Sequence, residues 1–346
     1  MSTTAQRGTD RRAHLADQGS GRRTAPLRGL AWLVGRQHRA AFALLLAAAI
    51  GGVVYCAVLR ARMASYIDAH HIAGCSEMSQ IARCADVQEA VTAFRAAYTA
   101  PFQLAEWGML ALPALIGLFI GAPLLAREWE AGTHQLVLTQ SVGPLRWLAA
   151  KTALPALAVV ATTTALSAAF GWMWQVGGNE VTGAYWYEPS GFHALGPIPV
   201  VHSLLMLAIG MLAGLLLRRT VASMGVTLGA TLAVQFAFGL LRPHLLSPVT
   251  SKSGSGEPAA PLADRAWRLA EGSYTRSGAK LPEDACDGYG KAYEACLRRH
   301  DVVGHFVEQH PASHQWPLVW TEAGIVLALT ALLTVIAFWA MRRRHG

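Results

Sequence analysis

Long apolar runs alternate with polar segments along this chain, and that pattern predicts the architecture. A helix needs roughly 20 apolar residues to cross the hydrocarbon core of a bilayer, which is about 30 Å thick. Six windows reach this length without an internal Asp, Glu, Lys or Arg. The predicted spans are 41–59, 107–126, 152–174, 197–217, 220–241 and 323–341.

The polar segments around these spans complete the expected organisation. Residues 1–25 are rich in Arg, Gly, Ser and Thr and predict a disordered cytoplasmic tail. Pro26 to Arg39 predicts an interfacial elbow helix, because apolar residues fall on one side and Trp32 and the arginines on the other. A basic tail helix is the alternative. One six-span domain, 26–341, then contains external loops 61–102 and 242–318, and 342–346 forms a second cytoplasmic tail.

Composition agrees with an all-α polytopic membrane protein. Apolar residues make up 53% of the chain and charged residues only 14%. Helices suit this environment because they satisfy their own backbone hydrogen bonds in lipid. We therefore expect no separate soluble domain, and a large extracellular loop between the fifth and sixth helices.

The positive charges set the expected orientation. Eight arginines and two aspartates precede the first span, Arg218 and Arg219 form the turn after the fourth, and Arg342 to Arg344 follow the sixth. Lys and Arg beside spans are retained in the cytoplasm. Both termini are therefore predicted in the cytoplasm, in a multi-pass plasma-membrane protein. The net charge of +8 follows from this topology and requires no nucleic-acid partner.

A charged, amphipathic interruption from Arg127 to Lys151 separates the second and third spans. It begins with Glu128 and Glu130, breaks at Gly132, continues through an apolar run and ends in basic residues. This order predicts a short helix on the cytoplasmic face that a soluble partner grips. A solvated helix start, with acids near its positive dipole end, fits the sequence equally well.

Four of the five cysteines lie in the external loops, which suits an oxidising exterior. Four cysteines allow three connectivities. Pairing within each loop is favoured, Cys75 with Cys84 and Cys286 with Cys296, because a ring of about ten residues closes easily. Metal binding by Cys75 and Cys84 with the nearby histidines, His70 and His71, is the alternative, but their spacing matches no compact zinc pattern. Cys56 is interpreted as a small buried apolar residue.

Polar groups within the spans are few. Glu106, Glu322 and His202 fall near outer ends and are predicted to reach water rather than relay protons. Hydroxyls of the third span and Gln235 of the fifth are interpreted as packing groups in preference to a pathway. Close helix contacts are predicted from three Gly-xxx-Gly pairs, and bending of the second span from two prolines: Gly117 and Gly121, Gly210 and Gly214, Gly225 and Gly229, Pro113 and Pro123.

Catalytic equipment is missing from the sequence. No G-x-x-x-x-G-K-[ST] phosphate loop is present, and His134 has no partner of the zinc-protease kind. We therefore expect no enzyme activity, no catalytic or metal-binding residues and no cofactor in this chain.

The interruption nevertheless resembles a known signature. The stretch from Glu128 to Thr133, Glu-Trp-Glu-Ala-Gly-Thr, is similar to the cytoplasmic segment of type-two ATP-binding-cassette permeases, as are the residues that follow it: Leu136, Leu138, Thr139, Val142 and Lys151. Together with Trp32 to Arg39, it resembles permease subunits common in actinobacteria. The six spans, the elbow, the tight turn between the fourth and fifth spans and the large last loop also resemble that family.

The resemblance implies an exporter permease of drugs, lipids or peptides. A separate ATPase subunit would bind ATP and grip a coupling helix, and a second permease subunit, identical or related, would complete the pathway in membrane lipid. The implied coupling residues are Glu128, Glu130, Gly132, Thr133, Gln135, Leu136, Leu138 and Val142. A sensor or scaffold with a ligand-binding external loop and a secondary transporter are the alternatives.

Overall fold

The structure, a computed structural model, is mostly helical and describes residues 35–36, 38–75, 82–132, 144–178, 184–254, 265–286 and 290–345. Six of its helical segments are long and apolar enough to cross a membrane. The membrane helices are α3 (Arg39–His70), α5 (Gln88–Ile116) continued by η1 (Gly117–Gly121) and α6 (Ala122–Glu130), α8 (Pro144–Gly177), α10 (Ile198–Leu217), α11 (Thr220–Leu241) and α13 (Gln315–His345).

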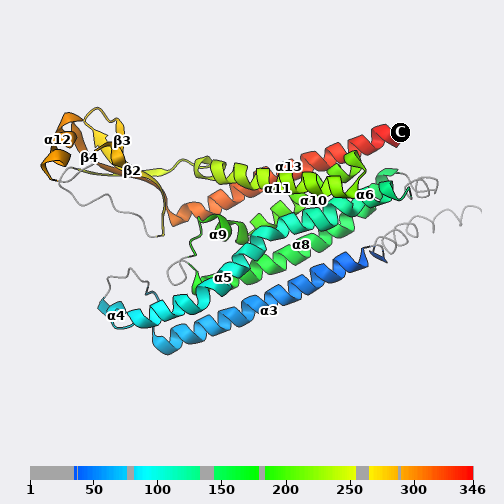
Figure 1. The fold of residues 1–346 in the computed structure, drawn as a ribbon, viewed down its shortest axis with the longest axis horizontal. Helices are drawn as coiled ribbons and strands as arrows, with labels where there is room; N and C mark the ends of the chain where they lie inside the picture. Colours follow the sequence, from blue (N-terminus) through cyan, green and yellow to red (C-terminus); the bar gives the residue numbers. More distant parts are fainter. Residues whose placement is uncertain are drawn as a thin grey trace, which may run out of the picture.

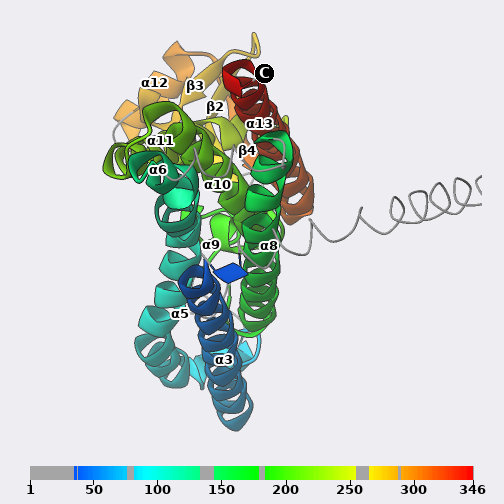
Figure 2. The ribbon, with the colours of Figure 1, turned by 90° about the vertical axis from the view of Figure 1, so that its right-hand side faces the viewer.

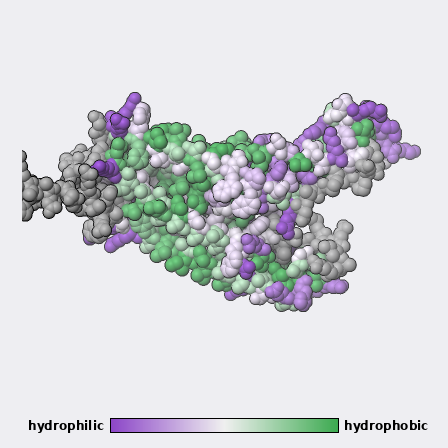
Figure 3. Space-filling model, turned by 180° about the vertical axis from the view of Figure 1, so that it is seen from behind, coloured by the Kyte–Doolittle hydropathy of each residue, from purple (hydrophilic) through white to green (hydrophobic). Residues whose placement is uncertain are grey.

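The helices form one elongated bundle. The start of α3 and the end of α13 lie at the same end, and the small sheet lies at the other (Figure 1). The end of the bundle where α6 finishes and α11 begins is called the Glu130 end. The opposite end, which carries the sheet, is called the sheet end. Apolar side chains cover the flank of the bundle and polar ones gather toward both ends, as a transmembrane arrangement requires (Figure 3).

Helix α10 lies at the centre of the bundle. Of its most apolar window 67% is buried, against 17% for the corresponding windows of α3, α11 and α13. It contacts α5, α6, α8, α11 and α13. Figure 2 shows α10 among these helices, with α3 at the bottom of the view. The exposed faces of the outer helices are apolar, so lipid or another membrane helix suits them.

Glycines allow α10 to approach the second span closely. A Cβ on Gly210 would lie 2.6 Å from the backbone nitrogen of Ala122, and one on Gly121 2.9 Å from the backbone oxygen of Leu207. Helix contact through these two Gly-xxx-Gly pairs is confirmed. The third pair, Gly225 and Gly229 on α11, differs, because a Cβ on either residue would meet no heavy atom within 4 Å. This pair packs against nothing in the described chain.

A π-helix interrupts the second span. Residues Gly117–Gly121 form it, between Pro113 near the end of α5 and Pro123 in the first turn of α6. Such wide turns accommodate one extra residue within an otherwise α-helical run. The irregularity expected from the two prolines therefore falls between them, at the glycines that face α10.

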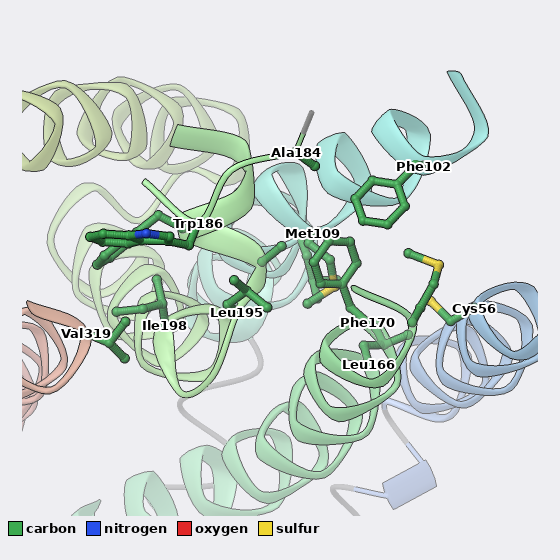
Figure 4. Close-up of a cluster of buried hydrophobic side chains, with 14 of the residues drawn as sticks. Cys56, Phe102, Met109, Leu166, Phe170, Ala184, Trp186, Leu195, Ile198 and Val319 are labelled. Atoms are coloured by element: carbon green, nitrogen blue, oxygen red, sulfur yellow. The ribbon is translucent and has the colours of Figure 1, made fainter. Parts of the chain in front are cut away.

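The hydrophobic core joins most of the spans. Figure 4 shows Phe102 and Met109 of α5 beside Leu166 and Phe170 of α8, with Cys56 of α3 next to them. Phe102 and Phe170 are fully buried. The same cluster continues to Trp186, Ile198 and Val319, and so reaches α10 and α13.

Regular secondary structure occurs in the described parts of both regions expected as external loops. Helix α3 continues to His70 and α5 begins at Gln88, so much of 61–102 is helical, with α4 (Ala82–Ala85) at its tip. The region 242–318 holds an antiparallel sheet in the order β1-β4-β2-β3, which the all-α expectation missed. Its elements are η2 (Arg242–His244), β1 (Val249–Gly254), β2 (Trp267–Thr275), β3 (Lys280–Pro282), η3 (Glu283–Ala285), α12 (Lys291–Arg299), β4 (Val302–His310) and η4 (Ala312–His314).

The sheet is bonded to the bundle. The Trp186 indole, before α9 (Pro189–Ala194), donates a hydrogen bond to the backbone oxygen of Arg265 at 2.9 Å. At the end of β4, His310 Nε2 lies 3.0 Å from the backbone oxygen of Pro243. The sheet therefore contacts the chain directly beside the end of α11.

Two disulfides lie at the sheet end. Cys75 is bonded to Cys84 between α3 and α5, and Cys286 to Cys296 between η3 and α12, with Cα atoms 5.6 and 5.7 Å apart. Each bond lies within one region, which is the connectivity favoured from the sequence. Cys56 is buried and unpaired.

Candidate functional site

Two clusters of polar side chains lie at opposite ends of the bundle. The first is at the Glu130 end and contains Glu128 and Glu130. The second, at the sheet end, surrounds Glu322. Both join helices that are far apart in the sequence, so both are candidates for the place where helix movements are controlled.

At the Glu130 end, Glu128 forms an ion pair with Lys151. The side chains are 13% and 2% exposed. The ammonium also lies 5.1 Å from the ring centre of Trp147, one turn earlier on α8. This pair connects the last turn of the second span to the first turns of the third.

The next two residues of α6 contact other helices. The guanidinium of Arg218 lies 4.6 Å from the ring centre of Trp129, a cation–π distance. The carboxylate of Glu130 accepts hydrogen bonds from the backbone nitrogen of Thr220 at 3.0 Å and from its hydroxyl at 2.5 Å. Glu130 thus caps the first residue of α11, where backbone donors lack helical partners.

An apolar layer supports these contacts. Leu125 of α6 and Leu148 of α8 are completely buried, and Met211 of α10 and Met341 of α13 pack in the same cluster. The three consecutive residues Glu128, Trp129 and Glu130 therefore lie over a packed layer built from four helices.

The predicted coupling segment is only partly described. Glu128, Glu130 and Gly132 are placed, and Gly132 follows α6 with a φ of +67° that suits glycine. Thr133, Gln135, Leu136, Leu138 and Val142 lie outside the described residues, as do residues 1–34, which include the expected tail and most of the elbow. The two placed acids engage partners within their own chain, a role that the sequence did not indicate.

His38 lies at the same end, just before α3. Burial, followed by the positive charges of Lys151 and Arg127, lowers the pKa of His38. A neutral imidazole is therefore favoured next to the Glu128 and Lys151 pair.

At the sheet end, Glu322 of α13 is the centre of a buried network. Arg242 donates to both of its oxygens, from Nε at 2.9 Å and from Nη2 at 3.2 Å. His202 Nε2 of α10 lies 3.0 Å from Oε1 of the same carboxylate. Arg242 Nη2 is also 3.2 Å from His193 Nε2 of α9. The network joins α9, α10, the end of α11 and α13.

Burial and charge fix the protonation of His193. Burial, then the positive charge of Arg242, lowers the pKa of His193 to about 3. The neutral ring accepts a hydrogen bond from Arg242 at Nε2. The carboxylate of Glu322 and the guanidinium then compensate each other inside the protein.

The donor set of this network partly resembles a metal site. One ligand-type atom each of His193, His202 and Glu322 lies within 4.8 Å of the others. However, Arg242 already occupies both oxygens of Glu322 and Nε2 of His193. The arrangement therefore fits an ion-pair network and not a metal centre.

The prediction that Glu106, Glu322 and His202 reach water is wrong. Their exposed fractions are 3%, 0% and 2%. Two features explain why these side chains are buried. Helices α5 and α13 begin well before their apolar windows, and α9 and the sheet cover the sheet end of the bundle. These groups are internal, and each must be satisfied by the protein.

Two hydroxyl groups and one amide of the spans donate hydrogen bonds to backbone oxygens. Thr163 donates to the backbone oxygen of Val159 at 2.8 Å, and Ser167 to that of Gly196 at 2.6 Å. Gln235 donates to the backbone oxygen of Leu110 at 3.3 Å, linking α11 to α5.

A groove of about 770 Å³ opens on the flank between α8, the start of α10 and α13. Its lining is aromatic and mostly apolar, with a few uncharged polar groups. Among the residues around it are Trp172, Trp174, Trp316, Trp320 and Gln175.

Comparison with known protein families places the chain. The model of one family, described as ABC-2 membrane transporter related, matches residues 43–242, more than half of the sequence. The chain belongs to the ABC-2 membrane transporter related family. No curated protein and no solved structure matches it.

The ABC-2-related region contains the contacts of α6 with α8 and α11 at the Glu130 end. Glu128, Lys151 and Thr220 all lie within it, as do His193, His202 and Arg242 of the sheet-end network. The sheet and α13, which carries Glu322, follow the matched region. The network therefore connects the matched spans to the part of the chain beyond them.

Proposed function

We propose that this ABC-2-related chain is the permease subunit of an ATP-driven exporter. The observation that carries the proposal is the family match over residues 43–242, which includes the sequence resembling a coupling segment. ATP would be bound and hydrolysed by a separate cassette ATPase, and this chain would convert the movement of that ATPase into rearrangement of its helices.

Charge and disulfides support a cytoplasmic Glu130 end. Arg127, Arg218, Arg219 and Arg343 lie at this end of their helices, and positive residues beside spans are retained in the cytoplasm. Both disulfides lie at the opposite end, which suits an oxidising exterior. Both termini would then be cytoplasmic, in the plasma membrane.

The contacts at the Glu130 end support a route for the movement. Residues 133–143 connect α6 to α8, so an ATPase that displaces them acts on both helices. Glu128 would pass the displacement to α8 through Lys151, and Glu130 would pass it to α11 through Thr220. The ATPase changes the populations of two arrangements only to the extent that it binds one of them more tightly.

The membrane-facing surfaces support the rest of the assembly. The apolar faces of α3 and α11, including the open glycine pair on α11, are available to a second permease subunit or to lipid. The aromatic groove supports an amphiphilic cargo, because rings and a few amides suit a molecule with an apolar body and a polar end.

The first experiment tests the ATPase connection. The tagged protein would be purified from its native membranes, and ATP hydrolysis by the co-purified complex measured in lipid nanodiscs. Leu136→Asp with Leu138→Asp should remove the ATPase, because the apolar run of the predicted helix would carry charge. Ser277→Asp, in the turn between β2 and β3, is the matched control and should retain it. An unchanged complex with the double variant contradicts the proposal.

The second experiment tests the orientation. A single cysteine at Gln135, in a Cys56→Ala background, should react with a membrane-impermeant thiol reagent only after the cells are opened. A reaction in intact cells would place the segment outside and would exclude ATPase docking there.

A further inference from the structure

Glu106 is a buried carboxyl with almost no compensation. It lies on α5, faces α9 and is 3% exposed. Its Oε2 accepts one hydrogen bond, from the hydroxyl of Ser190 at 3.3 Å. Its Oε1 is buried and has no hydrogen-bond partner among the described residues. An ionised carboxylate is expensive to bury with one neutral donor.

The described groups around Glu106 supply no compensating positive charge. No lysine, arginine or histidine among the described residues forms an ion pair with Glu106, and the charged group that acts on it is another acid, Glu188. Other elements packed on α5 carry Arg60 and Asp68 on α3 and His202 on α10. Arg60 stacks on a tryptophan of α8, Asp68 is exposed, and His202 bonds the carboxylate of α13.

The unpartnered oxygen lies beside a second acceptor. A Cβ placed on Gly191 would be 3.5 Å from Glu106 Oε1 and 2.7 Å from the backbone oxygen of Tyr185. The two oxygens thus border the same small space, which only a glycine leaves open. A proton on Oε1 would make this atom a hydrogen-bond donor. The backbone oxygen of Tyr185 can serve as its acceptor, because a carbonyl oxygen has two lone pairs and this one receives a single hydrogen bond, from the backbone nitrogen of Glu188.

We propose that Glu106, Ser190 and the Tyr185 carbonyl form a proton-binding site, in which Glu106 is a neutral acid while α9 packs against α5. When this contact opens, water reaches the carboxyl and the proton passes to water, leaving the carboxylate. Proton binding therefore stabilises the closed contact at the sheet end. This site goes beyond the proposed export function and does not depend on an ATPase.

Infrared spectroscopy of the purified protein in nanodiscs tests the site. Exposed Glu and Asp are ionised at pH 7 and therefore contribute no carbonyl-stretch band of a protonated acid. The wild-type protein should show such a band from Glu106, and Glu106→Gln should lack it. The control Glu188→Gln, which changes an acid of the same neighbourhood, should keep the band. A wild-type minus Glu106→Gln difference spectrum with carboxylate bands and no acid band would overturn the proposal.

Two further arms keep the test decisive. If the acid band appears in choline chloride and disappears in sodium chloride, the site binds a sodium ion and the proton proposal is overturned. If Glu106→Gln does not fold, Ser190→Ala replaces it: loss of the hydroxyl donor should shift the acid band to higher frequency. An unshifted band would mean that the protonated acid is not Glu106.

Discussion

The carboxylate of Glu128, near the end of α6, forms an ion pair with the ammonium of Lys151 on α8. Twenty-two residues separate these positions by sequence number, and most of the predicted coupling segment lies between them. The pair therefore holds together the two helices that this segment connects.

Removing Lys151 should destabilise the protein. Lys151→Met removes the ammonium partner from a largely buried carboxylate, which costs roughly 3–5 kcal/mol, here toward the lower end because Glu128 is 13% exposed. Thermal unfolding in detergent would measure the loss. The double variant Glu128→Gln with Lys151→Met should recover part of it, and exposed Arg146→Ala is the control. Equal melting of the single and double variants would contradict a compensated pair.

Substitution of Gly210 should separate two helices. In Gly210→Ala the added methyl meets backbone atoms at 2.6 and 2.7 Å, which cannot move as side chains do, so a loss of about 1–3 kcal/mol is expected. Gly225→Ala is the matched control, because its methyl enters open space. Melting temperatures of the two variants would decide. A similar loss for both would contradict an effect specific to the contact between α10 and the second span.

The two disulfides should differ in their effect on the bundle. Replacing Cys75 and Cys84 by serine frees the connection between α3 and α5, with an expected loss of about 2–3 kcal/mol from loop-closure entropy. Replacing Cys286 and Cys296 affects α12, far from the spans (Figure 1), and should leave bundle melting unchanged. Non-reducing gel mobility would verify each bond. Equal effects of the two double variants would argue against this separation.

Acid should weaken the sheet-end network. The pKa of His193 is lowered from 6.5 to about 3, so between these values the unfolded chain binds a proton that the folded protein does not. Stability is then present above pH 6.5 and decreases as the pH falls toward 3. Melting temperatures between pH 7.5 and 5 would test this. His193→Gln, whose amide oxygen can also accept from Arg242, should show a smaller decrease; an identical pH profile would exclude His193 as the cause.

The membrane spans could be predicted because their signal is local. Each of the six apolar windows lies, to within one residue, inside a helical segment of the structure. Their lengths could not be predicted in the same way, since α3 continues as a polar helix to His70 and α5 begins at Gln88, outside any hydrophobic window. Hydropathy therefore locates the part of a helix in lipid and not the ends beyond it.

The sheet and the Glu322 network could not be predicted because their contacts are distant in sequence. Strand β1 pairs with β4, with Val249 opposite Gln309, and the sequence of β1, VTSKSG, is mostly polar. His202 and Glu322 are 120 residues apart. Placed at the ends of separate spans, each resembled an interfacial residue, and only the folded chain brings the two into contact, with Arg242 beside the carboxylate.

The π-helix at Gly117–Gly121 sets the rotational phase of everything that follows it. One residue corresponds to about 100° of turn in an α-helix. Deleting a single residue there, so that the run becomes purely α-helical, would rotate the last turn of α6 by that angle while Glu106 stayed in place. Lys151, Arg218 and Thr220 would then lose their partners on α6 together. The extra residue in this wide turn therefore decides whether both ends of the second span contact their neighbours at the same time.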